Sequence, residues 1–199
     1  LGAVRRRGVA SLPWSDAAAR LRARMAFAHA AFPDWPDVSD AALAEHLDEW
    51  LEPAIGRARS WSDLERLDLT SALGDGLDWK RRRDLDTLAP THIEVPSGSR
   101  IPVDYSDPAA PALAVRLQEV FGLTESPRVG NGRIAVTMQL LSPAGRPVQV
   151  TRDLAGFWKT SYFDVRKEMR GRYPKHEWPE DPLAAAPTAR AKRRPPSSS

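Results

Sequence analysis

Between residues 14 and 90 the apolar side chains recur every three to four positions, the spacing of helices that bury one face. Ser15 is a suitable N-cap for the first of these helices, and Pro33 ends it. Its predicted buried face comprises Ala18, Leu21, Met25, Ala28 and Phe32. The pattern predicts that residues 14–90 form a helical subdomain.

Three further helices are expected in this part of the chain. One begins at Ser39 and ends at Pro53 after burying Leu43, Leu47, Trp50 and Leu51. The next begins near Ser60, with Asp63 placed as in a weak capping box, and is broken at residues 74–76 (Gly-Asp-Gly). The last runs from Leu77 to Leu88 and contains the basic run at residues 80–83.

After Pro90 the apolar period changes to two, which is typical of strands. Alternating segments around residues 93–95, 101–105, 134–140 and 148–151 predict four strands in two hairpins. Between the hairpins a helix is expected, with Leu113, Leu117, Val120 and Phe121 on one face. Residues 91–180 are thus predicted to form an α+β subdomain: a four-stranded, mainly antiparallel β-β-α-β-β unit, then a C-terminal helical region from about Asp153 to Arg172.

Two terminal segments lie outside these subdomains. Residues 1–13 are predicted to be a basic linker, and residues 181–199, which are rich in Ala, Pro, Ser and Arg, a disordered basic tail. The runs at 5–7 and 190–194 would be flexible arms that attract RNA weakly or only aid solubility. The first residue is not Met and no signal-peptide stretch follows, so we expect a part of a longer protein.

The distribution of charge along the chain is more informative than the net charge of +3. Residues 14–90 hold ten basic and fifteen acidic side chains, whereas residues 91–180 hold twelve basic and ten acidic. A polyanion contact is therefore expected late in the chain. No apolar run approaches the length of a membrane span, and no membrane partner is expected. The absence of cysteine excludes thiolate chemistry and suits the cytoplasm, the expected compartment.

The sequence provides no complete catalytic, metal or cofactor site. A phosphate-binding loop needs Gly, four residues and Gly-Lys-Ser/Thr, which do not occur here. The glycines at 74–76 and 130–132 are interpreted as turns, and the four histidines have no paired spacing. The acidic residues between 45 and 52 lie opposite a buried face and are interpreted as solvated. An independent enzyme is therefore disfavoured.

The stretch from residue 151 to 176 is different, because it combines aromatic residues with seven basic and three acidic side chains. On a helix, Tyr162, Val165 and Met169 form an apolar stripe, and residues 163, 166, 167 and 170 share another face. This pattern predicts a nucleic-acid-binding surface in which cations contact phosphates and aromatic rings stack on unpaired bases. The predicted phosphate contacts are Lys159, Arg166, Lys167, Arg170, Arg172 and Lys175, and the predicted stacking residues are Trp158 and Phe163.

An alternative interpretation remains open for this stretch. The aromatic residues 157, 158, 162 and 163 would complete the core, and the basic residues would be a solvated face paired with Asp164 and Glu168. A second candidate surface is the basic run at residues 80–83. Its field is largely cancelled by the neighbouring Asp75, Asp78, Asp84 and Asp86.

Several segments of the chain are distinctive in sequence and in order: residues 12–14 (Leu-Pro-Trp), 35–40 (Trp-Pro-Asp-Val-Ser-Asp), 88–99, 114–123 and 141–182. These segments resemble the C-terminal region of HrpB-type ATP-dependent helicases, a bacterial branch of the DExH/DEAH group. The resemblance covers roughly residues 12–187. It implies a parent protein whose two RecA-like lobes use ATP and Mg²⁺, and none of the motor motifs lies in this chain.

Two functions are therefore expected as alternatives. In the first, the chain is an accessory domain that contacts single-stranded RNA or clamps the motor lobes of the parent helicase. In the second, it is a docking module of the same helicase, whose acidic helical half and Trp-rich loops around Trp35 and Trp61 bind a protein without touching RNA.

Overall fold

The computed structural model describes residues 1–56 and 60–189 of the chain. They form two compact units. The N-terminal unit comprises Leu1–Pro90, Tyr105–Pro111 and Val129–Asn131. The C-terminal unit comprises Thr91–Asp104, Ala112–Arg128 and the described residues from Gly132 on. The predicted tail of residues 181–199, with its basic run at 190–194, lies partly outside the described residues.

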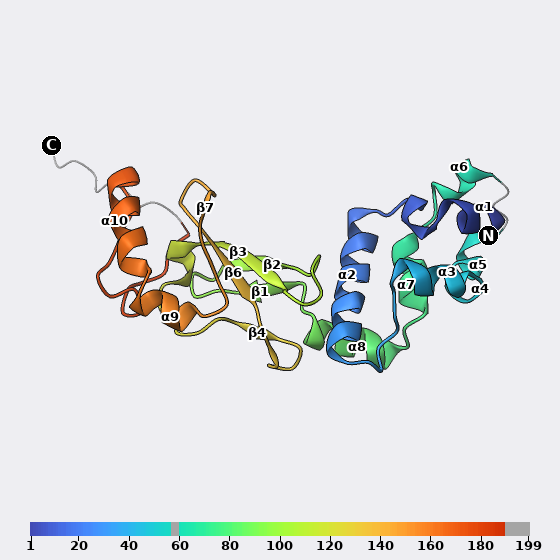
Figure 1. Cartoon of the computed structure of the whole chain (residues 1–199), viewed down its shortest axis with the longest axis horizontal. Coiled ribbons are helices and arrows are strands. Elements are labelled where there is room, and N and C mark those ends of the chain that lie inside the picture. The colour runs from blue at the N-terminus through green and yellow to red at the C-terminus, as the bar shows by residue number, and fades with distance from the viewer. Residues whose placement is uncertain (57–59, 190–199) are drawn as a thin grey trace. The chain divides into compact units, whose positions relative to one another are not determined.

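The N-terminal unit is helical (Figure 1). Its elements are α1 Gly2–Arg7, η1 Val9–Ser11, α2 Asp16–Ala31, α3 Asp40–Glu45, α4 Leu47–Trp50, α5 Glu52–Ile55, α6 Trp61–Leu64, α7 Leu69–Asp75 and α8 Trp79–Leu88. The first basic run, expected to be a flexible arm, lies in α1, whose Val4 is buried. Helix α2 packs against α7 and α8.

Polar caps define where these helices begin. The Ser15 hydroxyl accepts from the Ala18 amide at the start of α2, and Asp78 accepts from the Arg81 amide at the start of α8. Ser60 and Asp63 form the predicted capping box at α6. Each cap satisfies an amide that the first helical turn leaves without a partner.

Two predicted helices are divided in the structure. The helix expected from Ser39 to Pro53 becomes α3, α4 and α5. Helix α3 ends at His46, which leaves helical geometry at φ −105° and ψ 30°, and Pro53 does not end a helix as predicted but lies in the first turn of α5. The helix expected from Ser60 to residue 74 becomes α6 and α7, because the Asp68 side chain accepts from the amides of Thr70 and Ser71 and starts a new helix there. Apolar periodicity does not detect these breaks, since the buried face continues across them.

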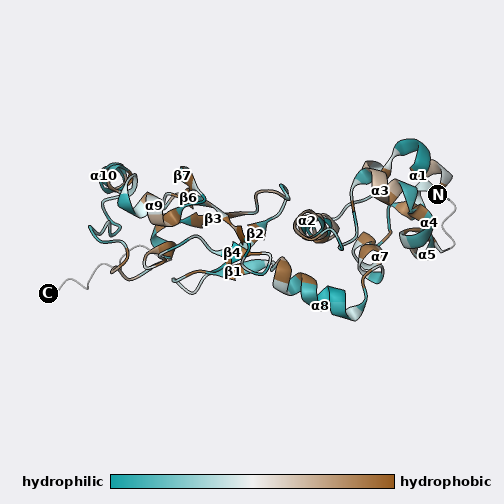
Figure 2. Cartoon of the chain, turned by 60° about the horizontal axis from the view of Figure 1, so that its bottom comes forward, coloured by the Kyte–Doolittle hydropathy of each residue, from teal (hydrophilic) through white to brown (hydrophobic). Residues whose placement is uncertain are grey.

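The core of the N-terminal unit includes Phe27 of α2, which packs on Tyr105 with 4.9 Å between ring centroids. Burial raises the pKa of Tyr105, whose hydroxyl donates to the Pro90 carbonyl. Arg24 joins α2 to α8 by donating to the Ala89 carbonyl and pairing with Asp86 at 2.6 Å. Figure 2 shows that α8 carries both hydrophobic and hydrophilic residues, as expected of a helix with one buried face.

The C-terminal unit is built on a five-stranded sheet of order β1-β2-β3-β6-β7. Its strands are β1 His92–Glu94, β2 Arg100–Asp104, β3 Ala112–Arg116, β6 Thr137–Leu141 and β7 Pro147–Thr151. A separate pair is formed by β4 Arg128–Val129 and β5 Ile134–Ala135. The remaining elements are η2 Leu117–Val120, α9 Leu154–Lys159 and α10 Tyr162–Arg172. The predicted α+β class is confirmed.

The predicted four-stranded β-β-α-β-β unit was wrong in two places. The strand expected over residues 134–140 is divided into β5 and β6, and the helix expected around Leu113 and Phe121 is strand β3 followed by the short η2, so the sheet has five strands. Leu113 and Val115 are buried while Ala114 and Arg116 are exposed, which is the alternation of a strand. As a result β3 is central in the sheet and pairs in parallel with β6, with Leu113 opposite Met138. The apolar residues 113, 117 and 120 have helical spacing by coincidence, because Leu113 belongs to strand β3 whereas Leu117 and Val120 belong to the 3-10 helix η2.

Two other local predictions concern a turn and the C-terminal helical region. Residues 130–132 form the predicted turn, and all three have positive φ. The C-terminal helical region is divided into α9 and α10 at Thr160, whose hydroxyl donates to the Gly156 carbonyl and whose φ and ψ are −123° and −85°. No helix among the described residues is long and apolar enough to cross a membrane.

Candidate nucleic-acid interface

The candidate surface is carried by α9, α10 and the residues after them. The Asp153 side chain accepts from the Gly156 amide at 2.8 Å and so fixes the start of α9. Leu154 and Phe157 of α9, and Tyr162 and Met169 of α10, are buried. One side of each helix therefore belongs to the core, and the opposite side of α10 faces solvent.

Trp158, predicted to stack on a base, is buried in an aromatic cluster. Its side chain is 4% exposed, and its Nε1 donates to the Leu123 carbonyl at 2.8 Å. The ring centroids of Trp158 and Tyr162 are 5.3 Å apart, and Phe121 and Phe157 complete the cluster. The ring of Trp158 has no face open to a base, so its role is to hold α9 against the loop at Leu123.

Phe163, the other predicted stacking residue, is 53% exposed. Its neighbour Tyr162 is fully buried and donates its hydroxyl hydrogen to the Pro179 carbonyl at 2.7 Å. Burial raises the pKa of Tyr162 to about 12. The two aromatic residues at the start of α10 thus face opposite ways: one packs and one is open to a ligand.

Arg166 also differs from its predicted role. Its Nε donates to the Trp178 carbonyl at 2.8 Å, its guanidinium pairs with Glu180 at 3.2 Å, and its side chain is 19% exposed. These bonds attach the segment of residues 173–188, here called the C-terminal strap, to α10. Arg166 is therefore committed to the protein's own backbone and has little capacity left for a phosphate.

The C-terminal strap is the feature that sequence reasoning missed. The Gly122 amide donates to the Pro182 carbonyl, and the Thr188 amide donates to the Gln118 carbonyl, both at 2.9 Å. Within the strap, burial and the charge of Arg116 lower the pKa of His176. The strap has no regular secondary structure, so hydrophobic periodicity does not predict it. Its contacts with Arg166 and Tyr162 are made by the backbone carbonyls of Trp178 and Pro179, and because every residue has a backbone carbonyl, the sequence does not indicate which ones accept these bonds.

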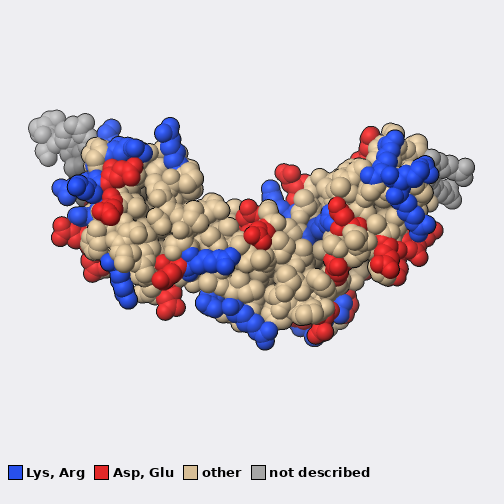
Figure 3. Space-filling view, viewed as in Figure 1, with Lys and Arg blue, Asp and Glu red and all other residues tan. Residues whose placement is uncertain are grey.

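Four predicted phosphate contacts remain available. Lys159, Lys167, Arg170 and Lys175 are exposed and have no hydrogen-bonded or ionic partner among the described residues. Arg172 is exposed but pairs with Glu168 at 3.3 Å. We call Phe163, Lys167 and Arg170, which share one side of α10, the α10 basic face; Lys159 and Lys175 flank it. Figure 3 shows basic side chains, with acidic ones among them, over α10.

The second basic run, in α8, is mostly paired. Lys80 pairs with Asp84 at 3.7 Å and Arg82 with Asp75 at 3.0 Å. Arg81 donates to the Asp34 carbonyl at 3.3 Å. Among the described residues, Arg83 has neither a carboxylate nor a carbonyl partner; its guanidinium lies 4.8 Å from the ring centroid of Trp79.

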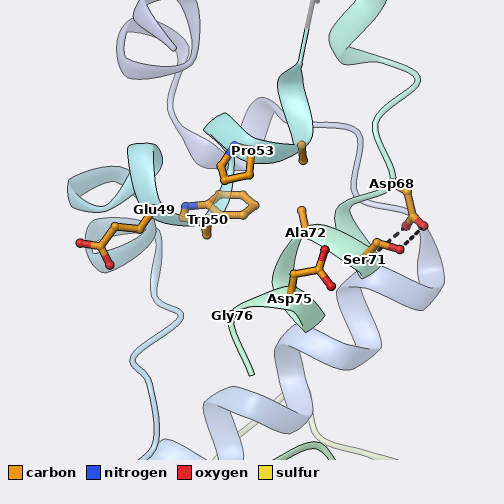
Figure 4. Close-up of a pocket in the computed structure, with 9 residues that line it drawn as sticks. Glu49, Trp50, Pro53, Asp68, Ser71, Ala72, Asp75 and Gly76 are labelled. Atoms are coloured by element: carbon orange, nitrogen blue, oxygen red, sulfur yellow. Dashed lines mark hydrogen bonds between the residues drawn. The ribbon is translucent and has the colours of Figure 1, made fainter. Parts of the chain in front are cut away.

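The N-terminal unit also has a hollow of about 400 Å³ beside Trp50 (Figure 4). Glu49, Asp68 and Asp75 line it together with the Trp50 ring. Hydrogen bonds from Ser71 lower the pKa of Asp68. The ring of Trp61, which was expected to help dock a partner, is covered by Arg7 at 4.2 Å.

No group of three potential metal ligands occurs in the described part of the chain. Three of the four histidines have hydrogen-bond partners, among them His92, whose Nδ1 lies 3.1 Å from the Thr91 hydroxyl. His29 Nδ1 lies 2.6 Å from the Trp35 carbonyl, and His46 Nδ1 lies 3.0 Å from Glu49.

Known proteins were compared with the chain by sequence and by structure. It is 46% identical over 195 residues to the ATP-dependent RNA helicase HrpB of Escherichia coli (strain K12), covering 97% of this chain and 24% of that protein. The crystal structure of the E. coli DExH-box NTPase HrpB matches with a TM-score of 0.88 and 45% identity, over 96% of this chain and 24% of that one. A crystal structure of the E. coli DEAH/RHA helicase HrpB matches with a TM-score of 0.74 and 43% identity, over 89% and 23%.

The chain thus spans about a quarter of the length of these relatives. The family model described as "ATP-dependent helicase C-terminal" matches residues 50–182. This match includes the last helices of the N-terminal unit, the whole sheet, α9, α10 and most of the C-terminal strap. The chain belongs to the HrpB family of ATP-dependent helicase C-terminal regions.

Proposed function

We propose that this chain is an accessory region of an ATP-dependent RNA helicase and contacts single-stranded RNA through the α10 basic face. One observation carries the proposal. Phe163 is 53% exposed on the same side of α10 as Lys167 and Arg170, which have no partner among the described residues. An open aromatic ring beside uncompensated cations suits a strand whose bases are unpaired.

Three contributions to the free energy would favour binding of an RNA strand at this surface. Lys167 and Arg170 break no ion pair of the protein when they bind phosphate, unlike Arg166 and Arg172. Each phosphate that they neutralise releases counterions from the strand. A base stacked on Phe163 would add on the order of 1 to 3 kcal/mol.

Hydrolysis of ATP belongs, in this proposal, to motor lobes that these residues do not contain. ATP and Mg²⁺ would be bound there, because this sequence lacks a phosphate-binding loop. The motor lobes would be the main protein partner of this chain. Its contribution to the helicase would be an additional hold on the strand.

The test measures binding of the 199-residue chain to a fluorescent oligouridine across a salt series. The test variant carries Lys167→Gln and Arg170→Gln. The matched control carries Arg100→Gln and Arg146→Gln, which remove two other exposed and unpaired cations of the same unit. Arg166 is left unchanged, because its loss would release the strap and confuse folding with binding.

Wild-type affinity is expected to fall with salt. The test variant is expected to bind more weakly with a smaller salt slope, reduced by about 0.7 for each phosphate that the chain no longer neutralises. The control is expected to stay close to wild type. If test and control variants weaken binding equally, the RNA contact is not at the α10 basic face. If the wild-type chain does not bind at low salt, the proposal is wrong.

The hollow beside Trp50 favours a second candidate function, docking of a protein. Its lining combines the Trp50 ring with the carboxylates of Glu49, Asp68 and Asp75, of which Asp75 also pairs with Arg82 (Figure 4). An aromatic ring beside several carboxylates suits a partner's basic side chain. The check is Glu49→Lys, measured for binding to helicase motor lobes supplied separately. Weaker binding to the lobes with unchanged RNA binding would support docking; unchanged binding to both would reject this hollow as the docking site.

A further inference from the structure

Trp79, the first residue of α8, is the most exposed large hydrophobic side chain of the N-terminal unit. Trp79 is 71% exposed, and the guanidinium of Arg83 lies 4.8 Å from its ring centroid. Residues four positions apart lie on the same side of a helix, so the ring and the cation form one surface. At this exposure a ring face remains open beside Arg83.

The carboxylates around Trp79 are already engaged. Asp75 pairs with Arg82 at 3.0 Å, Asp84 with Lys80 at 3.7 Å, and Asp86 with Arg24 at 2.6 Å. The side chain of Asp78 accepts from the Arg81 amide as the cap of α8. Arg83 is thus left without a carboxylate partner among the described residues. The acidic neighbours therefore cancel most of the charge of residues 80–83, as the sequence predicted, but they leave the charge of Arg83 uncompensated beside the exposed ring of Trp79.

We infer that Trp79 and Arg83 form a second stacking site for single-stranded RNA, in which Trp79 stacks on an unpaired base and Arg83 contacts the adjoining phosphate. The inference extends the proposed function and rests on it for the class of ligand. It assigns RNA contact to the N-terminal unit, whose overall charge gave no reason to expect it. The α10 basic face and the Trp79 site would each hold the strand independently.

The surroundings of Trp79 fit a nucleobase better than a protein surface. The core of a protein interface is a cluster of apolar side chains with few charges. Trp79 is the one exposed large hydrophobic residue in the described part of the N-terminal unit, and Asp78 and Lys80 beside it are exposed. A base needs only one ring and a nearby cation.

The two proposed sites share a local arrangement. In α10 the exposed Phe163 is followed at the fourth position by the unpaired Lys167, and in α8 the exposed Trp79 is followed at the fourth position by Arg83. Tryptophan offers the larger ring and the stronger interaction with a cation. The Trp79 site is therefore expected to contribute stacking at least as strong as that of Phe163.

The test uses the 199-residue chain and the same fluorescent oligouridine. Trp79→Leu keeps apolar bulk and removes the aromatic ring, Trp79→Phe restores a ring, and Arg83→Gln removes the charge. Val150→Ala, which shortens another exposed apolar side chain, is the matched control. Thermal unfolding of each variant verifies that the fold is retained.

Trp79→Leu is expected to lose about fivefold or more in affinity with an unchanged salt slope, and Trp79→Phe to recover most of it. Arg83→Gln is expected to lower the salt slope by about 0.7. Quenching of tryptophan emission by oligouridine should be smaller in Trp79→Phe than in the wild type. Val150→Ala should bind as the wild type does.

The outcomes separate this inference from the proposed function. If Trp79→Leu and Arg83→Gln bind as the wild type does while the Lys167 and Arg170 variant weakens, the Trp79 site is wrong and the α10 basic face stands. If Trp79→Leu weakens binding to separately supplied motor lobes but not to RNA, Trp79 is a protein contact and the inference is overturned. Absence of RNA binding by the wild type overturns both.

Discussion

At the scale of the residue, side chains of one chemical type take different roles according to their partners. Arg166 and Arg170 lie on the same helix, yet Arg166 donates to a backbone carbonyl of the C-terminal strap and Arg170 is exposed without a partner among the described residues. Trp158 and Trp79 differ in the same way, with exposures of 4% and 71%. The first member of each pair stabilises the fold, and the second is available for binding.

Replacing Arg166 with alanine is expected to lower the free energy of unfolding by about 1 to 3 kcal/mol. The change removes the bond to the Trp178 carbonyl and the pair with Glu180 from a side chain that is only 19% exposed. Urea unfolding measures the loss. Arg172→Ala, which breaks only the exposed pair with Glu168, is the control and should cost less than about 1 kcal/mol. Equal losses would show that Arg166 does not stabilise the strap.

Asp68 is predicted to make stability depend on pH. Hydrogen bonds from Ser71 and Thr70 hold the pKa of its carboxyl below the ordinary 3.8. A carboxyl with a lowered pKa in the folded state stabilises the fold above its unfolded pKa, and this contribution is lost as pH falls through the folded value. The difference in stability between wild type and Asp68→Ala should therefore be larger at neutral pH than in acid. Urea unfolding at both pH values tests it, with the exposed Asp48→Ala as control.

At the scale of the element, the sequence predicted helix starts well and interruptions poorly. Ser15, Ser39 and the pair of Ser60 and Asp63 cap helices as expected, because capping depends on a side chain and an amide three residues away. The break at Asp68 is made by a local cap of the same kind, but the continuous apolar face hid it, and periodicity also did not detect the break at His46 or strand β3. On α10 the helical spacing predicts which residues share the basic face. It does not predict that Trp158 is buried or that Arg166 bonds to the strap, because both depend on contacts with residues distant in the sequence.

The cap of α8 is expected to matter for the stability of that helix. Asp78 accepts from the Arg81 amide at 2.7 Å, so Asp78→Ala should cost about 1 kcal/mol. Asp78→Ser, which keeps a capping oxygen, should recover most of the loss. Chemical unfolding compares the three proteins. An alanine variant as stable as the wild type would show that packing of Leu85 and Leu88 alone sets the start of α8.

At the scale of the whole molecule, each unit has its own buried core. The N-terminal core includes Phe27 and Leu69, and the C-terminal core includes Leu113, Met138 and Tyr162. The proposed RNA contacts lie on the outer sides of α8 and α10, helices whose other sides are buried in these cores. Rigid helices with a buried side hold aromatic rings at fixed positions, which favours stacking.

Met138→Ala is expected to cost about 2 to 5 kcal/mol, because Met138 is fully buried on the interior strand β6, between β3 and β7. The loss should fall on the C-terminal unit alone if its core opens as a separate cooperative unit. Hydrogen exchange would then show faster exchange for the amides of β3 and β6 and unchanged exchange for those of α2. Faster exchange throughout both units would contradict separate opening.

The C-terminal strap also has a consequence for biosynthesis. A chain is made from its N-terminus, so the aromatic cluster is complete once Tyr162 has been added, before Pro179 and Pro182 exist to bond Tyr162 and Gly122. Until they emerge from the ribosome, the nascent C-terminal unit exposes part of its core to the chaperones and proteases of the cell. Stalling of synthesis between Tyr162 and Pro182 would leave a C-terminal unit whose core lacks the cover that the strap provides.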